Sequence, residues 1–169
     1  TAVAMPARID AHIEQQAREV ALTAVKVLNG VGIFVVELFE TPDGRVLINE
    51  VAPRPHNSGH LTIEACATSQ FEQHLRAIAG LPLGSTALHA PAVMMNLLGP
   101  VGRNGQAVLE GVGNALGRGG SVHWYAKAEV RPGRKMGHVT ALGDSVEEAH
   151  SCCESALAQL NIGTADGQV

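Results

Sequence analysis

The segment from Asn49 to His60 constrains the fold of this chain more than any other. It reads Asn-Glu-Val-Ala-Pro-Arg-Pro-His-Asn-Ser-Gly-His, and its two prolines and its glycine exclude a regular helix or strand across it. A β-type run precedes it, and a segment of helical periodicity follows it. The sequence therefore predicts a rigid polar loop between a strand and a helix, where binding and catalytic side chains often gather.

Apolar spacing divides the first half of the chain into two helices and a hairpin. Apolar residues recur three or four apart in the helical segments, and β-branched runs flank a Thr-Pro-Asp-Gly turn signal. The second helix is expected to carry Leu61, Ala65, Phe71, Leu75 and Ile78 on one side. The expected elements are a helix over 8–28 that ends at Asn29-Gly30, strands over 32–39 and 45–51, and a helix over 61–79.

The second half of the chain is richer in β-type runs and glycine. A first domain over 1–80 and a linker over 81–91 should precede a small β-rich domain over 92–145. Ser145, which acidic residues follow, predicts the N-cap of a closing helix to about Leu160, with a frayed end to the tail at 169. The pattern predicts a mixed α/β (α+β) fold. Its expected strands are 92–98, 121–129 and 138–142, with a glycine-rich surface connection over 99–120.

The composition of the chain argues against two classes of partner, nucleic acids and membranes. With 169 residues, 46% of them hydrophobic and 17% charged, the chain is long enough for one domain and a small second one. Its net charge is -4 and its 12 basic residues are scattered, which argues against a nucleic-acid partner. No apolar run approaches the ~20 residues that cross a bilayer, which argues against a membrane partner. Three cysteines form no disulfide framework and predict a reducing, cytoplasmic location.

Two carboxylates, Glu37 and Glu50, fall on the two strands of the expected hairpin. A four-residue loop from Pro42 to Arg45 would place them directly opposite each other on one face, whereas a three-residue loop would place them on opposite faces. Opposed carboxylates repel unless a cation lies between them, and Mg²⁺ binds through one or two carboxylates plus substrate phosphates. The pair therefore predicts either a nucleotide-metal site or two solvent-facing strand residues.

The polar loop itself carries Arg54, His56, Asn57 and Ser58. Arginine binds carboxylate or phosphate oxygens, and histidine titrates near neutral pH, so anion binding and acid–base chemistry are both plausible. A zinc site from His56, His60 and Glu64 is disfavoured, because the proline and the glycine of the loop break the helix that would align them. The alternative is a proline-stiffened loop whose Asn57 and Ser58 cap the next helix.

A basic turn lies near the end of the β-rich region. Lys127 and the segment Arg131-Pro132-Gly133-Arg134-Lys135 place four cations around a Pro-Gly turn, next to one tryptophan and one tyrosine. Such a group could hold a phosphate monoester. The alternative is a solvated basic turn without a ligand.

Four segments carry a family resemblance: Glu37 to Phe39, Asn49 to His60, Thr68 to Arg76 and Arg131 to His138. Together they resemble the ATP-grasp carboxyaminoimidazole ribonucleotide synthetases of purine biosynthesis, especially the fungal-type bifunctional phosphoribosylaminoimidazole carboxylases. The similarity spans about residues 5–145, and the loop motif is its most specific part. It implies the last part of an ATP-grasp domain followed by a small β-rich C-terminal domain. It also implies carboxylation of aminoimidazole ribonucleotide with ATP and bicarbonate.

The resemblance implies a role for each candidate residue. The position two after Glu50, often a metal-binding asparagine in ATP-grasp proteins, is Ala52 here, so water and phosphate oxygens should complete the metal shell. The resemblance implies that Glu37 and Glu50 are Mg²⁺ ligands, with Asn49 beside them at the nucleotide. It implies catalytic roles around carboxyphosphate and the substrate amine for Arg54, His56 and Asn57. The implied substrate-binding residues are Ser58, Lys127, Arg131 and Arg134, with Lys127 and Arg134 clamping the ribonucleotide phosphate.

Two function classes follow. The stronger is a segment of an ATP-dependent carboxylating enzyme, homo-oligomeric in its full-length form. The chain begins at Thr1 and has three lysines, so we expect a fragment that lacks the glycine-rich lid and adenine pocket of the family and does not turn over alone. The alternative is a noncatalytic phosphate-ligand binding or assembly module.

Overall fold

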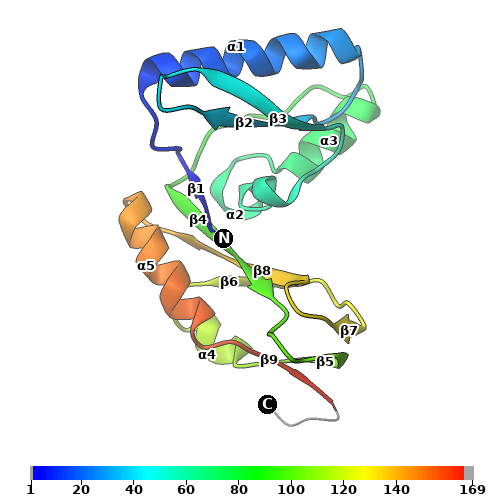
Figure 1. Cartoon of the computed structure of the whole chain (residues 1–169), viewed down its shortest axis with the longest axis vertical. Coiled ribbons are helices and arrows are strands. Elements are labelled where there is room, and N and C mark those ends of the chain that lie inside the picture. Colours follow the sequence, from blue (N-terminus) through cyan, green and yellow to red (C-terminus); the bar gives the residue numbers. More distant parts are fainter. Residues whose placement is uncertain (1, 166–169) are drawn as a thin grey trace. The chain divides into compact units, whose positions relative to one another are not determined.

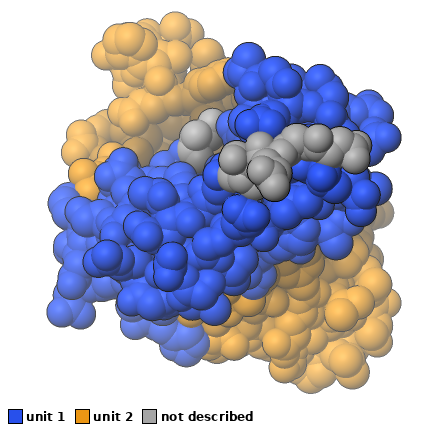
Figure 2. All heavy atoms as spheres, turned by 90° about the horizontal axis from the view of Figure 1, so that it is seen from below, with its two compact units in different colours: residues 1–6, 88–169 blue, residues 7–87 orange. Residues whose placement is uncertain are grey.

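The computed structural model describes residues 2–165 and divides them into two compact units. One unit comprises residues 7–87, and the other comprises the rest of the described chain (Figure 2). The predicted division into domains over 1–80 and 92–145, a linker over 81–91 and a terminal helix and tail over 146–169 stays a prediction. In the structure, the first strand (Ala2–Met5) belongs to the same unit as residues 88–165. None of the described helices has both the length and the apolar character needed to cross a membrane.

The unit of residues 7–87 pairs a long helix with a two-stranded hairpin and ends in short helices (Figure 1). The first helix ends as predicted at Asn29, whose left-handed conformation (φ 47°) stops the helical hydrogen bonds. The predicted hairpin is also confirmed. The elements are α1 (Ala11–Leu28), β2 (Val35–Glu40), β3 (Val46–Ala52), the 3₁₀ turn η1 (Asn57–Gly59), α2 (Thr62–Ala65) and α3 (Gln70–Ile78).

The predicted single helix over 61–79 is wrong, because it is split into α2 and α3. The backbone becomes extended at Cys66, and the N–H of Ala67 donates to the carbonyl of Ala87 at 2.9 Å instead of to a helical partner. Ser69 then starts α3 by accepting the N–H of Glu72 on its side chain. A side-chain cap and a long-range backbone bond therefore override the continuous periodicity.

The buried face of α3 is also different from the predicted one. Gln70 and Gln73 are each 7% exposed, whereas Phe71, Leu75 and Ile78 are exposed. The side-chain amides of both glutamines form hydrogen bonds with backbone groups outside α3, Gln70 with His56 and Gln73 with Gly84. Hydrogen bonding rather than apolar spacing therefore decides which face of α3 turns inward.

The other unit contains two antiparallel sheets with helices beside them (Figure 1). Helix α5 (Val146–Leu157) packs against β4 (Ala92–Leu98) and β8 (Lys135–Leu142), the two central strands of the larger sheet. The larger sheet has the order β1 (Ala2–Met5), β4 (Ala92–Leu98), β8 (Lys135–Leu142), β6 (Ser121–Trp124), and the smaller has the order β7 (Glu129–Val130), β5 (Gly105–Glu110), β9 (Asn161–Thr164); the helices are α4 (Val112–Leu116) and α5 (Val146–Leu157).

Predictions for this unit hold where the signal was local. The strand over 92–98 and the Ser145 cap of α5 are confirmed, whereas the expected 121–129 strand ends at Trp124, shortly before Ala126 takes a positive φ of 51°. The expected surface connection over 99–120 contains β5 and α4. The tail is not frayed at 161–164, where β9 pairs with β5. The end of the tail, 166–169, lies outside the described residues.

The two units differ in how much apolar surface they bury. The unit with the larger sheet has a contiguous core of twelve buried residues, among them Met136 and Val139 at 0% exposure. The unit of residues 7–87 buries few large apolar side chains and exposes Leu22, Val27 and Phe39. The unit of residues 7–87 thus has a smaller apolar core than the unit with the larger sheet.

Truncating Met136 should destabilise the core of the larger sheet. Met136→Ala leaves a cavity in a fully buried cluster, and we expect the free energy of unfolding to fall by about 2–5 kcal/mol. Val101→Ala is the control, because Val101 is 94% exposed in the same unit and should change stability by less than about 0.5 kcal/mol. Chemical denaturation measures both, and similar losses in the two variants would contradict the assigned core.

Candidate active site

The hairpin places Glu37 and Glu50 opposite each other through a β-bulge that the sequence did not predict. The turn closes tightly, with the N–H of Thr41 donating to the carbonyl of Arg45 at 2.9 Å, which leaves a three-residue loop. That register alone would pair Glu37 with Asn49. A β-bulge between Glu37 and Leu38 inserts Asn49 as an extra residue, so Glu37 pairs with Glu50. The three-residue loop therefore coexists with opposed carboxylates, contrary to the expectation.

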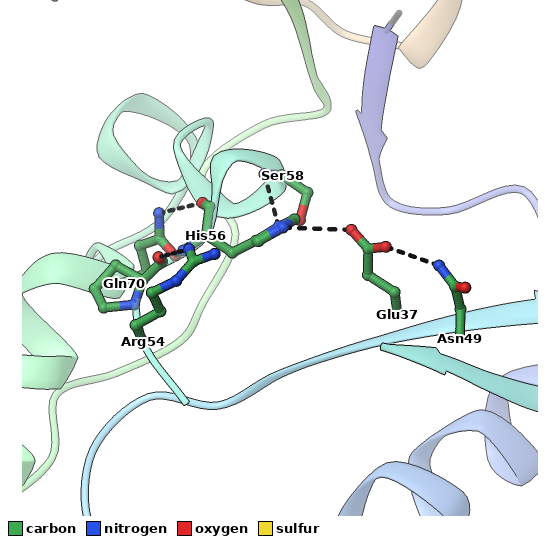
Figure 3. A network of polar contacts seen from close by, with 7 residues as sticks. Glu37, Asn49, Arg54, His56, Ser58 and Gln70 are labelled. Carbon is green, nitrogen blue, oxygen red and sulfur yellow. Dashed lines mark hydrogen bonds and ion pairs between the residues drawn. The ribbon is translucent and has the colours of Figure 1, made fainter. Parts of the chain in front are cut away.

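The Glu37 carboxylate joins the hairpin to the polar loop (Figure 3). Its Oε2 accepts the side-chain amide of Asn49 at 3.1 Å, and its Oε1 lies 3.4 Å from Nε2 of His56. Glu37 keeps 39% of its side chain exposed, whereas His56 keeps only 16%. The carboxylate is thus both fixed and accessible.

The donor set of the hairpin fits a magnesium ion. Glu37, Glu50 and Asn49 offer carboxylate and amide oxygens, which Mg²⁺ prefers, and Mg²⁺ needs only one or two carboxylates when substrate phosphates complete its shell. Across residues 2–165 no three His, Cys, Asp or Glu side chains gather as a metal cage. The residues are therefore suited to a nucleotide-bound ion rather than to an all-protein site.

The hydrogen bonds of His56 fix its tautomer. Its Nδ1 accepts the backbone N–H of Ser58 at 3.3 Å and lies 2.9 Å from the Ser58 hydroxyl. A backbone N–H can only donate, so in the neutral ring the proton resides on Nε2, which faces Glu37. The ring nitrogen that could act on a ligand is therefore Nε2.

The remaining loop residues have distinct surroundings. Arg54 is exposed, and its guanidinium donates to the carbonyl of its neighbour Pro55 at 3.0 Å. The carbonyl of Asn57 accepts the N–H of His60 at 3.2 Å within η1. Ser58 contacts His56 rather than capping the next helix, and Leu61 at the start of α2 supplies no side-chain cap. The capping alternative for Ser58 is therefore wrong.

Sequence reasoning missed Gln70 as part of this site. Its amide lies behind the loop and forms hydrogen bonds with both backbone groups of His56 (Figure 3). Gln70 belonged to the quoted Thr68 to Arg76 segment, but its spacing carried no chemical signal. Its only sequence signature is a polar residue directly after the Ser69 N-cap.

The basic turn, in the other unit, gathers three of the predicted cations. The ammonium of Lys127 donates to the carbonyl of Lys135 at 2.6 Å and lies 5.6 Å from the Tyr125 ring centroid. Burial lowers the pKa of Lys127, and the positive charges of Arg134 and Lys135 lower it further. These groups therefore repel one another, which is a suitable starting point for binding a phosphate.

Arg131 differs from the other predicted phosphate ligands. Its guanidinium pairs with the Glu129 carboxylate at 2.8 Å, and this hydrogen bond lowers the pKa of Glu129. Arg134 instead donates to the backbone carbonyl of Glu129 at 3.0 Å. The charge of Arg131 is thus matched within its own turn, whereas the side chains of Lys127 and Arg134 donate to backbone carbonyls.

Both halves of the chain are similar to known protein families. Residues 1–71 match the ATP-grasp domain family, and residues 92–151 match the family of the phosphoribosylaminoimidazole carboxylase C-terminal domain. The chain is 50% identical over 155 residues to a chloroplastic phosphoribosylaminoimidazole carboxylase of Vigna aconitifolia, covering 88% of this chain and 28% of that protein.

Solved structures give the same result. N5-carboxyaminoimidazole ribonucleotide synthetase of Thermotoga maritima matches with a TM-score of 0.90 and 53% identity, over 96% of this chain and 46% of that one. The Aspergillus clavatus synthase, solved with ADP and 5-aminoimidazole ribonucleotide, matches with a TM-score of 0.81 and 37% identity, over 93% of this chain and 43% of that one. The chain thus spans less than half the length of these relatives.

Removing one cation of the basic turn should change the titration of another. We expect Arg134→Met to raise the pKa of Lys127, because a repulsive positive charge is lost. The Cε chemical shift of Lys127 during a pH titration by NMR measures this, and only three lysines contribute signals. Arg131→Met is the matched control, since Arg131 is paired with Glu129 and should leave Lys127 unchanged. An equal effect of both variants would contradict the repulsion between Arg134 and Lys127.

Proposed function

We propose that this chain, whose residues 1–71 belong to the ATP-grasp family and 92–151 to that of the phosphoribosylaminoimidazole carboxylase C-terminal domain, forms part of a carboxylating active site. The substrate is aminoimidazole ribonucleotide, and the carboxyl group comes from bicarbonate with ATP as the energy source. The observation that carries the proposal is the contact of the opposed-carboxylate hairpin with the His56 loop through Glu37. The Aspergillus clavatus synthase, solved with ADP and 5-aminoimidazole ribonucleotide, supports it.

The hairpin residues hold the nucleotide end of the site. Glu37 and Glu50 would bind Mg²⁺ on their shared face, with Asn49 orienting the Glu37 carboxylate through its amide. When bound, the ion neutralises phosphate oxygens of ATP. The hydrogen bond from Asn49 keeps one oxygen of Glu37 in place, so the carboxylate needs little reordering to bind a cation.

The loop residues act on the carboxyl group and the substrate amine. The exposed guanidinium of Arg54 would stabilise negative charge on the activated carboxyl group. His56 would orient the substrate by donating from its Nε2–H, the ring position that is not occupied by Ser58. To take the proton of the amine at Nε2, the ring would first pass its own Nε2 proton to the Glu37 carboxylate, 3.4 Å away. Asn57 would help to orient the same amine from the start of η1.

The basic turn binds the ribonucleotide phosphate. Lys127 and Arg134 would clamp the phosphate, and a bound dianion would relieve the repulsion that lowers the pKa of Lys127. Arg131 is also proposed to bind the substrate, although it must share its charge with Glu129. Ser58 is proposed separately as a substrate-binding residue of the His56 loop. Binding at the phosphate fixes the amine without contacting it, which lowers the entropic cost of reaction.

The context of the complete protein follows from the same similarity. A plant carboxylase and a bacterial synthase are about equally similar to the chain, at 50% and 46% identity. We therefore propose only the ATP-dependent carboxylation step, and a second catalytic domain, as in the fungal-type arrangement, is not needed for it. A homo-oligomeric state and a cytoplasmic location stay predictions from the sequence.

Alanine variants of the loop test the mechanism. The assay protein is a chimera in which this chain replaces the matching segment of the Thermotoga maritima synthetase. Arg54→Ala and His56→Ala should each lower the rate of bicarbonate-dependent phosphate release at saturating substrate about 100-fold, because each removes a group that contacts the reacting atoms.

Arg45→Ala is the control for charge removal. Arg45 is exposed and pairs with Asp43 in the hairpin turn, so its loss should leave the rate within about twofold of the unmodified chimera. Phosphate release that survives in the Arg54 and His56 variants would refute their assigned roles. An unmodified chimera that folds and binds the ribonucleotide but never releases phosphate would support a noncatalytic binding module instead.

A further inference from the structure

We infer that Gln70 is a positioning residue for His56: its buried amide holds the loop backbone so that His56 Nε2 faces the Glu37 carboxylate. The contact network stands on the structure alone, whereas its consequence for catalysis rests on the proposed function. Gln70 contacts neither Glu37 nor the hairpin in this network; it acts through the His56 backbone.

The first argument is the pairing between Gln70 and His56. The N–H of His56 donates to Oε1 of Gln70 at 3.0 Å, and Nε2 of Gln70 donates to the carbonyl of His56 at 2.8 Å. Because the backbone N–H can only donate and the carbonyl can only accept, the orientation of the amide is fixed by the network. The pairing restrains the peptide groups on both sides of His56, as a neighbouring strand would.

The same amide reaches a second histidine. Nε2 of Gln70 lies 2.9 Å from Nδ1 of His60, and the amide NH₂ has a second hydrogen available for it. His60 Nδ1 is therefore an acceptor, which places the proton of the neutral ring on Nε2. One side chain thus fixes the backbone of His56 and the tautomer of His60.

Gly59 leaves the space that this arrangement requires. A Cβ at Gly59 would lie 2.4 Å from Oε1 and 2.7 Å from Cδ of Gln70, well inside van der Waals contact. Gly59 has an ordinary φ, so close approach rather than backbone conformation explains the glycine. Alanine at this position should therefore push the Gln70 amide away from His56.

The base of Gln70 is fixed as well. Its backbone N–H donates to the hydroxyl of Thr62 at 2.9 Å, and that hydroxyl donates to the carbonyl of Gly59 at 2.6 Å. Gln70 is also the first residue of α3, directly after the Ser69 N-cap. A side chain that is 7% exposed and anchored at both ends can hold a loop within the narrow tolerance that catalysis needs.

Gln73 provides a matched control on the same helix. It is also 7% exposed, and it pairs with both backbone groups of Gly84, at 3.0 Å and 2.7 Å. Its chemistry and burial equal those of Gln70, but it holds the segment after α3 rather than the His56 loop. The substitution of Gln73 by Glu therefore reproduces the cost of the chemical change without affecting His56.

Ring-nitrogen NMR of the 169-residue chain tests the network directly. The chain has eight histidines, so long-range ¹⁵N–¹H spectra can resolve each ring. We expect His56 and His60 in the Nε2–H tautomer, and we expect Gln70→Glu to place a proton on Nδ1 of His60, because the carboxylate can no longer donate to it. Gly59→Ala should alter the same two rings, whereas Gln73→Glu should leave them unchanged.

Kinetics of the chimera test the consequence. Gln70→Glu should lower the rate at saturating substrate about 10- to 100-fold, as for loss of groups that orient metal-site or catalytic residues, with little change in KM. Gln73→Glu should retain the rate within about twofold.

The outcomes separate the two proposals. Unchanged His56 and His60 rings in both Gln70→Glu and Gly59→Ala would overturn the positioning role, as would equal rate losses in the two glutamine variants. If Gln70→Glu fails to fold, Gly59→Ala decides the question by the same spectra. An inactive unmodified chimera would refute the proposed function, while the ring tautomers would still decide whether Gln70 holds His56.

Discussion

The candidate site depends on the register of the β2–β3 hairpin. Side chains alternate between the two faces of a strand. A register shift of one residue would therefore pair Glu37 with Asn49 instead of with Glu50. The bulge at Asn49 shifts the register that the tight turn sets by one residue, so that Glu37 pairs with Glu50. The Asn49 amide then lies within hydrogen-bond distance of the Glu37 carboxylate. One local irregularity therefore creates the opposed carboxylates and orients one of them.

The polar loop obtains its rigidity from hydrogen bonds rather than from regular structure. Its prolines remove backbone donors, and His56 has no neighbouring strand to satisfy its own peptide groups. The Gln70 amide replaces that strand, and the Ser58 N–H fixes the imidazole. Hydrogen bonds therefore fix both the backbone and the tautomer of His56, whose ring faces Glu37. In this way the loop holds the imidazole in a defined position without regular secondary structure.

Local signals predicted a substantial part of the fold. The end of α1 at Asn29 and the Ser145 cap of α5 were predicted because each depends on a few neighbouring residues. Strand β4 was predicted from its own seven-residue, mostly apolar run, although its partners β1 and β8 are distant in the sequence. Strands β1, β5 and β9 were not predicted, since none of them carries an apolar run of that length and each pairs with a distant segment. The split of α2 from α3 escaped for a similar reason: the extended segment is held by Ala87, far beyond the helix.

For the site, the sequence by itself determined the inventory: two strand glutamates, an Arg-Pro-His-Asn-Ser loop and a basic Pro-Gly turn, whose residue types and order carry the family resemblance. Only the tertiary structure decided how these groups meet. It paired Glu37 with Glu50 through a bulge, turned His56 Nε2 toward Glu37, matched Arg131 with Glu129 and buried Gln70 behind the loop. The physical reason is that residue chemistry is a property of single positions, whereas register, tautomer and charge pairing depend on partners that folding brings together.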